Sequence, residues 1–183
     1  MSIQGKRVAI LVEDQYQVLE VWYPLLRLQE AGVKVQTVGT GTKDVYLSKE
    51  GYPIKVDLSI QNINSSEYDG VVIPGGYAPD ILRRYASVVD FVRQMSLSGK
   101  IVASICHGGW LLVSAGILKG KKVTCFFAIK DDLVAAGGEY VDAEVVVDRN
   151  LITSRKPEDL PKFVAGIIRL LSEKQDRKSR NSK

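Results

Sequence analysis

Continuous apolar runs recur along the chain, and each stops at charged or small residues. Residues 7–12 read RVAILV and end at two acidic residues, and residues 69–74 read DGVVIP and end at two glycines. Residues 101–103 form a third run, and residues 33–38 alternate between apolar and polar positions. Runs of this kind are typical of strands buried in a parallel sheet. We therefore expect strands at these four places.

Helical spacing fills the gaps between these runs. Apolar residues recur three and four positions apart from residue 18 to Ala31, and Gly32 ends the pattern. Pro24 fits such a helix if the helix begins near Glu20 or Val21, because the first four N–H groups of a helix have no partner to lose. The same spacing predicts helices that end near residue 97 and that cover residues 129–136 and 157–171.

Shorter elements complete the pattern. Residues 39–57 predict a hairpin with its turn near residues 49–51, and residues 144–147 and 151–153 flank the turn of another. Residues 122–126 predict one more strand. Strands separated by helices indicate an α/β fold, a three-layer sandwich with a mostly parallel central sheet.

Functional groups of such sheets gather at the carboxyl ends of the strands. Glu20 follows the first strand, Gly75 and Gly76 follow the strand at residues 69–74, and Cys106 follows the next. We expect these residues to meet in one crevice.

Residues 101–116, IVASICHGGWLLVSAG, predict a strand, a sharp turn and a short helix. This is the pattern of a nucleophile elbow, in which small residues let the backbone bend tightly beside the nucleophile. The lifted side chain is Cys106, and a thiol at a helix N-terminus is expected to be acidic. The alternative is a buried structural cysteine, since free cysteines are often buried. His107, the only histidine, directly follows Cys106 and favours the catalytic interpretation.

Composition places the chain among ordinary globular proteins. It has 183 residues, of which 45% are hydrophobic and 25% charged. Residues 174–183 hold the whole net charge of +4, and the rest of the chain has 20 basic and 20 acidic residues. Because residues 1–173 carry no net charge, the sequence argues against nucleic-acid binding. We expect one domain over residues 1–173 and a disordered basic tail over residues 174–183.

The sequence also predicts where the protein works. No apolar run approaches the roughly 18 residues of a membrane span, and the first residues lack the apolar stretch of a signal peptide. We therefore expect a cytoplasmic protein with no membrane partner. Two cysteines do not make a disulfide framework, and Cys125 is expected to be a small core residue rather than a second reactive thiol.

Four blocks of the sequence are distinctive when taken together: VIPGGYAPD at residues 72–80, VASICHGGWLLVSAGILKGKKVT at 102–124, IKDDLVAAGGEYVDAEVVVD at 129–148 and TSRKPEDL at 153–160. In this order they resemble the ThiJ/PfpI superfamily, most closely its branch of PfpI intracellular peptidases and protein deglycases. The resemblance covers nearly everything except the basic tail. It implies a flavodoxin-like fold of the class I glutamine amidotransferase type, assembled as a homodimer or higher oligomer. We expect no cofactor and no metal ion.

The resemblance also implies roles for single residues. Cys106 stands at the nucleophile position, and His107 matches the histidine that follows it. Asp80 stands where PfpI proteins carry a glutamate that is offered across a subunit interface to complete a triad, so the active site would be shared. Glu20 matches the carboxyl group that hydrogen-bonds the thiolate. The N–H groups of Gly76 and His107 would form an oxyanion hole. Asp80 and Glu20 could instead be ordinary first-turn acids.

This chain departs from the family pattern at two places. It has Gln17, Val18 and Leu19 where relatives often show acidic residues before Glu20, so the rim of the pocket is less acidic. Phe126 stands where relatives place a tyrosine or histidine. A phenyl ring can pack against a substrate but offers it no hydrogen bond.

Two classes of function fit these residues. The first is a cysteine-dependent hydrolase that acts on a small carbonyl compound or a peptide: an intracellular peptidase, or a deglycase or glyoxalase for methylglyoxal-type adducts. The second is a noncatalytic stress-response redox sensor or chaperone, whose Cys106 is oxidised to sulfinate beside Glu20. His107 favours the enzyme, since a sensor needs only the thiol and an acceptor. A glutamine amidotransferase is set aside, because no histidine follows His107.

Overall fold

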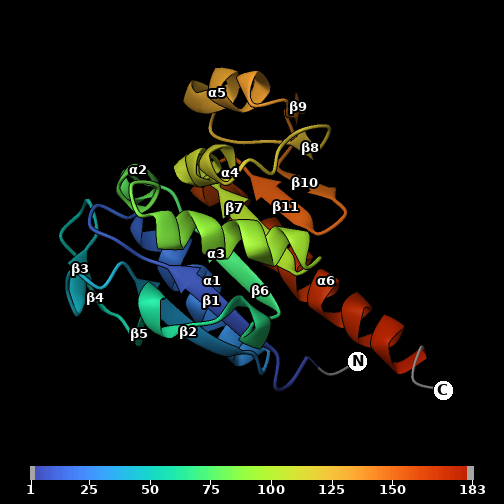
Figure 1. Ribbon diagram of the computed structural model, residues 1–183, viewed down its shortest axis with the longest axis horizontal. Helices are drawn as coiled ribbons and strands as arrows, with labels where there is room; N and C mark the ends of the chain where they lie inside the picture. The colour runs from blue at the N-terminus through green and yellow to red at the C-terminus, as the bar shows by residue number, and fades with distance from the viewer. Residues whose placement is uncertain (1–2, 181–183) are drawn as a thin grey trace.

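The computed structural model describes residues 3–180, which form three layers with a sheet in the middle (Figure 1). The order of the seven strands is β10-β11-β7-β6-β1-β2-β5. Neighbouring strands are parallel, except for the antiparallel pair β10 and β11. The predicted mostly parallel sheet is confirmed. The strands are β1 (Arg7–Leu11), β2 (Lys34–Gly39), β5 (Leu58–Ser59), β6 (Gly70–Ile73), β7 (Ile101–Ile105), β10 (Val145–Asp148) and β11 (Leu151–Ser154).

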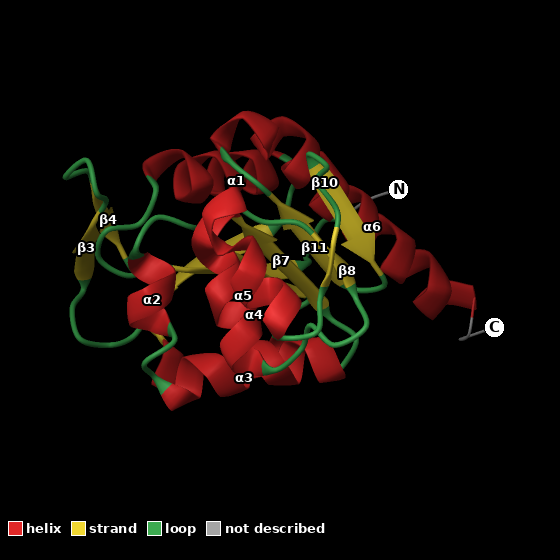
Figure 2. Ribbon diagram, turned by 90° about the horizontal axis from the view of Figure 1, so that it is seen from above, coloured by secondary structure: helices red, strands yellow, loops and turns green. Residues whose placement is uncertain are grey.

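Helices cover both faces of this sheet (Figure 2). Helices α1 (Val18–Glu30) and α6 (Leu160–Arg180) pack on one face. The other face carries α2 (Ala78–Leu82), α3 (Ala86–Leu97) and α4 (Gly109–Ala115), with α5 (Lys130–Ala135) against α4. Short 3-10 turns lie at Ile60–Asn62, Ser65–Glu67, Cys106–Gly108, Phe127–Ile129 and Pro157–Asp159.

Strand β1 shows why the apolar runs are continuous. Val8 and Ile10 lie in the apolar cluster of α1 and α6, whereas Ala9 and Leu11 lie in the cluster of the opposite face. Successive side chains of a strand point to opposite faces, so a strand covered on both sides needs apolar residues throughout.

Helix α1 begins earlier than the proline suggested. It starts at Val18, and Pro24 lies inside it. The side chain of Gln17 caps the helix by accepting a hydrogen bond from the N–H of Glu20. Pro24 has no N–H to give to the carbonyl of Glu20, yet its ring is buried and the helix continues to Glu30. The expected start near Glu20 or Val21 is therefore wrong.

Other boundaries also differ from the sequence pattern. The expected helix before residue 97 is two helices, α2 and α3. The strand expected at residues 122–126 is only β8 (Lys122–Val123), which pairs with β9 (Glu139–Tyr140) outside the main sheet. The next residues bond elsewhere: the N–H of Thr124 donates to the Thr153 hydroxyl, and that of Phe126 to the Cys106 carbonyl. This path brings Phe126 to the end of β7.

The C-terminal helix is longer than predicted. Helix α6 runs from Leu160 to Arg180, beyond the expected end at Leu171. The division into a domain over residues 1–173 and a basic tail over residues 174–183 stays a prediction. Residues 181–183 lie outside the described residues. Within residues 3–180, no helix is both long and apolar enough to cross a membrane.

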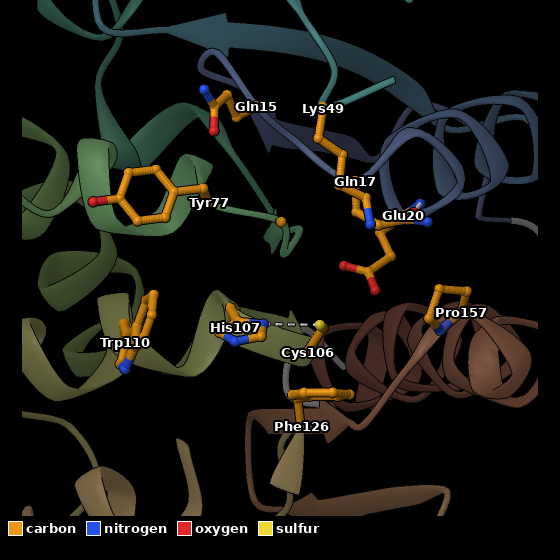
Figure 3. Close-up of a pocket in the computed structure, with 11 residues that line it drawn as sticks. Gln15, Gln17, Glu20, Lys49, Tyr77, Cys106, His107, Trp110, Phe126 and Pro157 are labelled. Atoms are coloured by element: carbon orange, nitrogen blue, oxygen red, sulfur yellow. Dashed lines mark hydrogen bonds between the residues drawn. The ribbon is translucent and has the colours of Figure 1, made fainter. Parts of the chain in front are cut away.

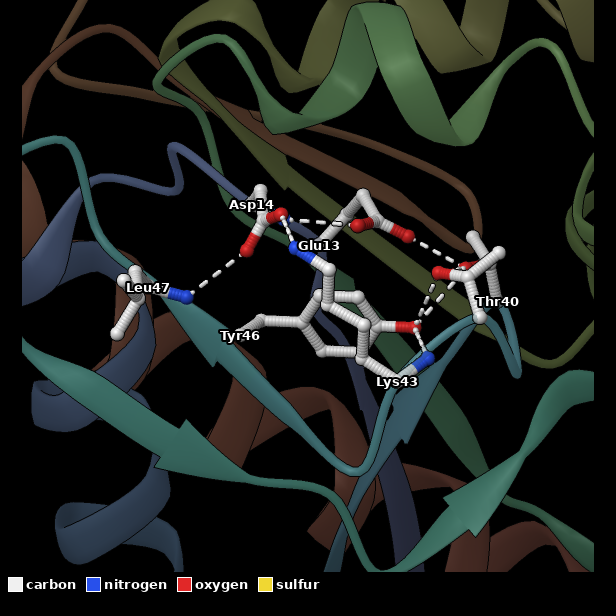
Figure 4. Close-up of polar contacts among 7 residues, drawn as sticks. Glu13, Asp14, Thr40, Lys43, Tyr46 and Leu47 are labelled. Carbon is white, nitrogen blue, oxygen red and sulfur yellow. Dashed lines mark hydrogen bonds and ion pairs between the residues drawn. The ribbon is translucent and has the colours of Figure 1, made fainter.

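A small hairpin is fastened to the end of β1. It consists of β3 (Val45–Leu47) and β4 (Pro53–Lys55), as the sequence predicted, with Lys49 in its turn region. The Tyr46 hydroxyl lies 3.0 Å from the Thr40 hydroxyl, which donates to the buried carboxylate of Glu13 (Figure 4). The backbone N–H of Lys49 donates to the carbonyl of Tyr16. These contacts hold Lys49 beside the loop that follows β1.

Replacing Tyr46 with phenylalanine tests this attachment. Tyr46 is fully buried, and its hydroxyl also lies 3.1 Å from the Thr42 hydroxyl, so Tyr46→Phe should lower the free energy of unfolding by about 1–2 kcal/mol in urea titration. Tyr52→Phe is the matched control on the same hairpin, because the side chain of Tyr52 is 55% exposed. Equal effects of the two substitutions would contradict this account of the hairpin.

Candidate active site

Three strand ends meet at the carboxyl edge of the sheet, as the sequence predicted. Strand β6 lies between β1 and β7. Glu20 stands on α1, which follows β1, while Gly75 and Gly76 follow β6 and Cys106 follows β7. The N–H of Gly75 donates to Oε2 of Glu20 at 2.6 Å, which joins two of the three segments.

The turn at Cys106 is a nucleophile elbow. Cys106 has a φ of 60°, in the left-handed region that residues with a side chain rarely adopt. Gly108 makes the bend possible, because a Cβ atom there would lie 2.4 Å from the carbonyl oxygen of Ile73. Helix α4 then ends at Ala115, and Gly116 caps it, as expected.

The elbow brings two sequence neighbours into contact. Sγ of Cys106 lies 3.3 Å from Nδ1 of His107 (Figure 3). Adjacent side chains of a regular strand or helix do not face one another, so the positive φ is what makes this contact possible. The backbone N–H groups of His107 and Gly76 also face the sulfur.

Glu20 is fully buried beside the thiol. Its Oε2 accepts from Gly75, while its Oε1 has no hydrogen-bond partner among the described residues. Burial raises the pKa of Glu20 to about 7, although the hydrogen bonds to it oppose the shift. Near neutral pH this carboxyl group therefore holds a proton for much of the time.

The other two titratable groups are also shifted by burial. Burial, and after it the charge of Glu20, raise the pKa of Cys106 to about 12, against the two facing N–H groups. Burial and the nearby Lys49 lower the pKa of His107. The expectation of an acidic thiol is thus contradicted: the imidazole is neutral, and the N–H groups do not outweigh desolvation. The Cys106 proton must move to another group during a reaction.

These residues line a pocket of about 410 Å³. The sequence pattern did not identify several of the residues that line it. Lys49 reaches it from the β3–β4 hairpin, which no sequence pattern places there, whereas Trp110 stands three residues after His107, a helical spacing that could have revealed it. The lining residues are Gln15, Gln17, Glu20, Lys49, Gly76, Tyr77, Cys106, His107, Trp110, Phe126 and Pro157.

Asp80 is outside this pocket within one chain. It lies on α2, its carboxylate pairs with Arg84 in the turn after this helix, and this pairing lowers the pKa of Asp80. No hydrogen bond joins Asp80 to His107 in the part of the chain that the structure describes. The contribution of Asp80 to a neighbouring subunit stays a prediction.

The second cysteine is a core residue, as expected. Cys125 is 1% exposed and packs in the cluster between the sheet, α4 and α5. Burial raises the pKa of its thiol to about 12. Phe126, next to it, lines the pocket and stacks against the imidazole of His107, with ring centroids 5.0 Å apart.

The fold and the elbow together define a class: α/β sandwiches with a buried cysteine in a sharp turn at the carboxyl end of a central strand. The chain belongs to the DJ-1/PfpI family, which it matches over residues 6–170. It is 41% identical to Deglycase PfpI of Pyrococcus furiosus, over 90% of this chain and 99% of that protein. It is 37% identical to the Putative cysteine protease YraA of Bacillus subtilis, over 91% of this chain and 99% of that one.

A solved structure agrees with this assignment. The crystal structure of a two-domain protein from Anabaena variabilis, with DJ-1/ThiJ/PfpI-like and ferritin-like domains, superposes with a TM-score of 0.90. The two are 41% identical, and the match covers 92% of this chain and 48% of the longer one.

The raised pKa of Glu20 predicts a pH-dependent effect of Glu20→Gln. The folded chain keeps a proton on Glu20 that the unfolded chain loses above its ordinary pKa of 4.5, so this group makes the wild type less stable as pH rises from 4.5 to about 7. Glutamine does not titrate. The free energy of unfolding of the variant should therefore rise relative to that of the wild type across this window, by up to about 3 kcal/mol in denaturant titrations.

Glu30→Gln is the control for this experiment, because Glu30 stands on the same helix with its side chain 75% exposed. This variant removes a carboxyl group from the surface of the helix and leaves the buried site unchanged, so it is the baseline for the effect of Glu20→Gln. A constant difference for Glu20→Gln would mean that Glu20 is ionised normally in the folded chain.

Proposed function

We propose that this chain is a cysteine-dependent hydrolase of the PfpI type, in which Cys106 attacks a substrate carbonyl. The contact of 3.3 Å between Cys106 Sγ and His107 Nδ1, inside a pocket, is the observation that supports it. The names of the relatives, deglycase and putative cysteine protease, point to two substrate classes: methylglyoxal-type adducts and peptide amides.

The neutral imidazole suits the role of general base. Nδ1 of His107 accepts the thiol proton while Sγ forms a bond to the carbonyl carbon. The carbonyl oxygen then gains negative charge, and the N–H groups of Gly76 and His107 are the donors closest to the sulfur. Protonated Glu20 adds no opposing negative charge beside the thiolate.

For an amide, the remaining steps follow from this proton transfer. The imidazolium gives the proton to the leaving nitrogen as the C–N bond breaks, which leaves a thioester on Cys106. Water then adds to the thioester carbon and gives a proton to His107; the C–S bond breaks, and the thiolate recovers that proton. The acid product leaves, and Cys106 and His107 return to their starting forms.

Turnover of a methylglyoxal-derived amine adduct and of a peptide amide tests the proposal. Cys106→Ser should lower kcat/KM by more than about 10³-fold, and His107→Gln by about 10²–10⁴-fold through loss of the base. Cys125→Ala is the matched control and should keep wild-type turnover, because its thiol lies in the core. No turnover by the wild type, or full turnover by Cys106→Ser, would refute the proposal.

A redox sensor is the second candidate. The observation in its favour is Glu20 Oε1, a buried oxygen without a partner beside Cys106, which could hydrogen-bond a sulfinate. His107 separates the two candidates. A sensor that reads oxidation of Cys106 should tolerate His107→Gln, whereas a hydrolase should not.

The shared site predicts that two inactive variants restore each other. Asp80→Asn should slow turnover by up to about 10⁴-fold if its carboxylate orients His107 of the neighbouring subunit. The fold should survive, because Asp80 is partly exposed and surface ion pairs contribute about 1 kcal/mol or less. Mixed with Cys106→Ser in equal amounts, a homodimer should regain about one quarter of wild-type activity, since half the dimers carry one intact site of two.

Asp90→Asn is the matched control for the mixing experiment. Asp90 on α3 pairs with Arg93, as Asp80 pairs with Arg84, and it also lies outside the pocket of its own chain. The Asp90→Asn variant should therefore keep wild-type turnover without being mixed with another variant. Hybrid oligomers that form without any rescue would show that the acid is not supplied across an interface.

A further inference from the structure

The imidazole of His107, the base of the proposed reaction, makes one hydrogen bond to the residues that the structure describes. Nδ1 of His107 faces the sulfur of Cys106, and its Nε2 bonds to no described residue. A single contact at one corner of the ring leaves the imidazole free to turn about its side-chain bonds. Other contacts must therefore hold its plane.

Two aromatic rings supply these contacts. The indole of Trp110 meets the imidazole edge-to-face, with centroids 4.9 Å apart and planes at 65°. The ring of Phe126 meets it at 5.0 Å and 31°. Figure 3 shows the imidazole between these two rings, with Nδ1 directed at Cys106. Both geometries are those of favourable aromatic pairs.

The indole is itself held from another helix. Nε1 of Trp110 donates a hydrogen bond of 2.8 Å to Oδ2 of Asp132, in the first turn of α5. Trp110 stands on α4, so the bond ties the helix of the elbow to its neighbour. Asp132 does not line the catalytic pocket. Its hydrogen bond to Trp110 is therefore the contact that links it to the site.

We propose that Trp110, fixed by Asp132, is a positioning residue that holds the imidazole of His107 with Nδ1 against the Cys106 thiol. The proposal rests on the hydrolase function above and adds the way in which the base is oriented within one chain. It also leaves Nε2–H as the free edge, where a carboxylate of a neighbouring subunit would bind. In this proposal the packed rings orient Nδ1 towards the thiol, and the carboxylate would bind Nε2–H.

Substitutions at Asp132 give the cleanest test. Asp132→Ala removes the acceptor and should lower kcat about 10-fold or more with little change in KM, because the residue does not touch the pocket. Asp132→Asn keeps an acceptor oxygen and should restore most of the rate. Asp131→Ala is the matched control: it removes an acid from the same helical turn, one without a hydrogen bond to Trp110, and should behave like the wild type.

Pairing the two residues tests the connection between them. Trp110→Phe loses the N–H but keeps a ring, so its effect on kcat should match that of Asp132→Ala. The double variant should be no slower than either single one, since both remove the same bond. If the kcat of the double variant instead falls by the product of the two single losses, the proposal is overturned.

His107 can be observed directly, because it is the only histidine. In wild-type chain labelled with ¹⁵N-histidine, the nitrogen shifts should report one dominant tautomer with the proton on Nε2. In Asp132→Ala they should move towards a mixture of tautomers, and the imidazole pKa should rise as water reaches the ring. The other charged or titratable groups of the site, Cys106, Glu20 and Lys49, are unchanged in this variant.

The two proposals fail in different ways. A wild type without turnover would refute the hydrolase, yet the NMR comparison would still show whether Asp132 and Trp110 orient His107. Unchanged His107 spectra in Asp132→Ala, or equal changes in Asp131→Ala, would refute the positioning role even if the enzyme is active.

Discussion

The backbone of Gly75 lies so close to Glu20 and Cys106 that no larger residue fits between them. A Cβ atom there would be 2.6 Å from Oε2 of Glu20 and 2.7 Å from Cβ of Cys106. Because β6 lies between β1 and β7, the sheet fixes this approach, and the missing side chain lets the two functional groups meet across it. The carboxyl group and the thiol are thereby buried together, and their chemistry follows from that.

Burial changes what each group can do. A carboxyl group with a pKa near 7 and a thiol with a raised pKa cannot both be ionised at neutral pH. The neutral imidazole, in contact with the sulfur, can take the thiol proton at the moment of attack. In the proposed reaction, a neutral thiol and a neutral imidazole therefore wait side by side, and charge develops only when Cys106 attacks a carbonyl.

The sequence predicted the elements correctly where the surroundings of a segment are uniform along its length. The runs at residues 7–12 and 69–74 lie between two apolar layers, so their pattern alone identifies the strands. The elbow could be predicted for a similar reason: small residues after Cys106 are required by the bend itself. These features depend on local geometry, which a sequence records.

The errors came from bonds between distant segments. The strand at residues 122–126 is shortened because Thr124 bonds to Thr153 and Phe126 to the backbone of Cys106, partners that no local pattern reveals. The start of α1 is the exception and has a local cause, because the side chain of Gln17 caps the helix by accepting from the N–H of Glu20, three residues along the chain. Lys49 was missed since it arrives on a folded-back hairpin.

The departures from the family pattern acquire a physical meaning in this structure. Phe126, for which the resemblance implied a tyrosine or histidine, is one of the two rings that contact the imidazole of His107. Gln17 and Gln15 bring no charge to the pocket, Glu20 is fully buried, and His107 is held neutral. Among the described residues that line the pocket, Lys49 is the one lysine or arginine, and its ammonium group lies 3.5 Å from the carboxylate of Glu50. The pocket therefore presents mostly uncharged side chains to a substrate. In the proposed reaction such a pocket raises no barrier to a neutral carbonyl compound, and the negative oxygen that forms on attack by Cys106 is left to the N–H groups of Gly76 and His107.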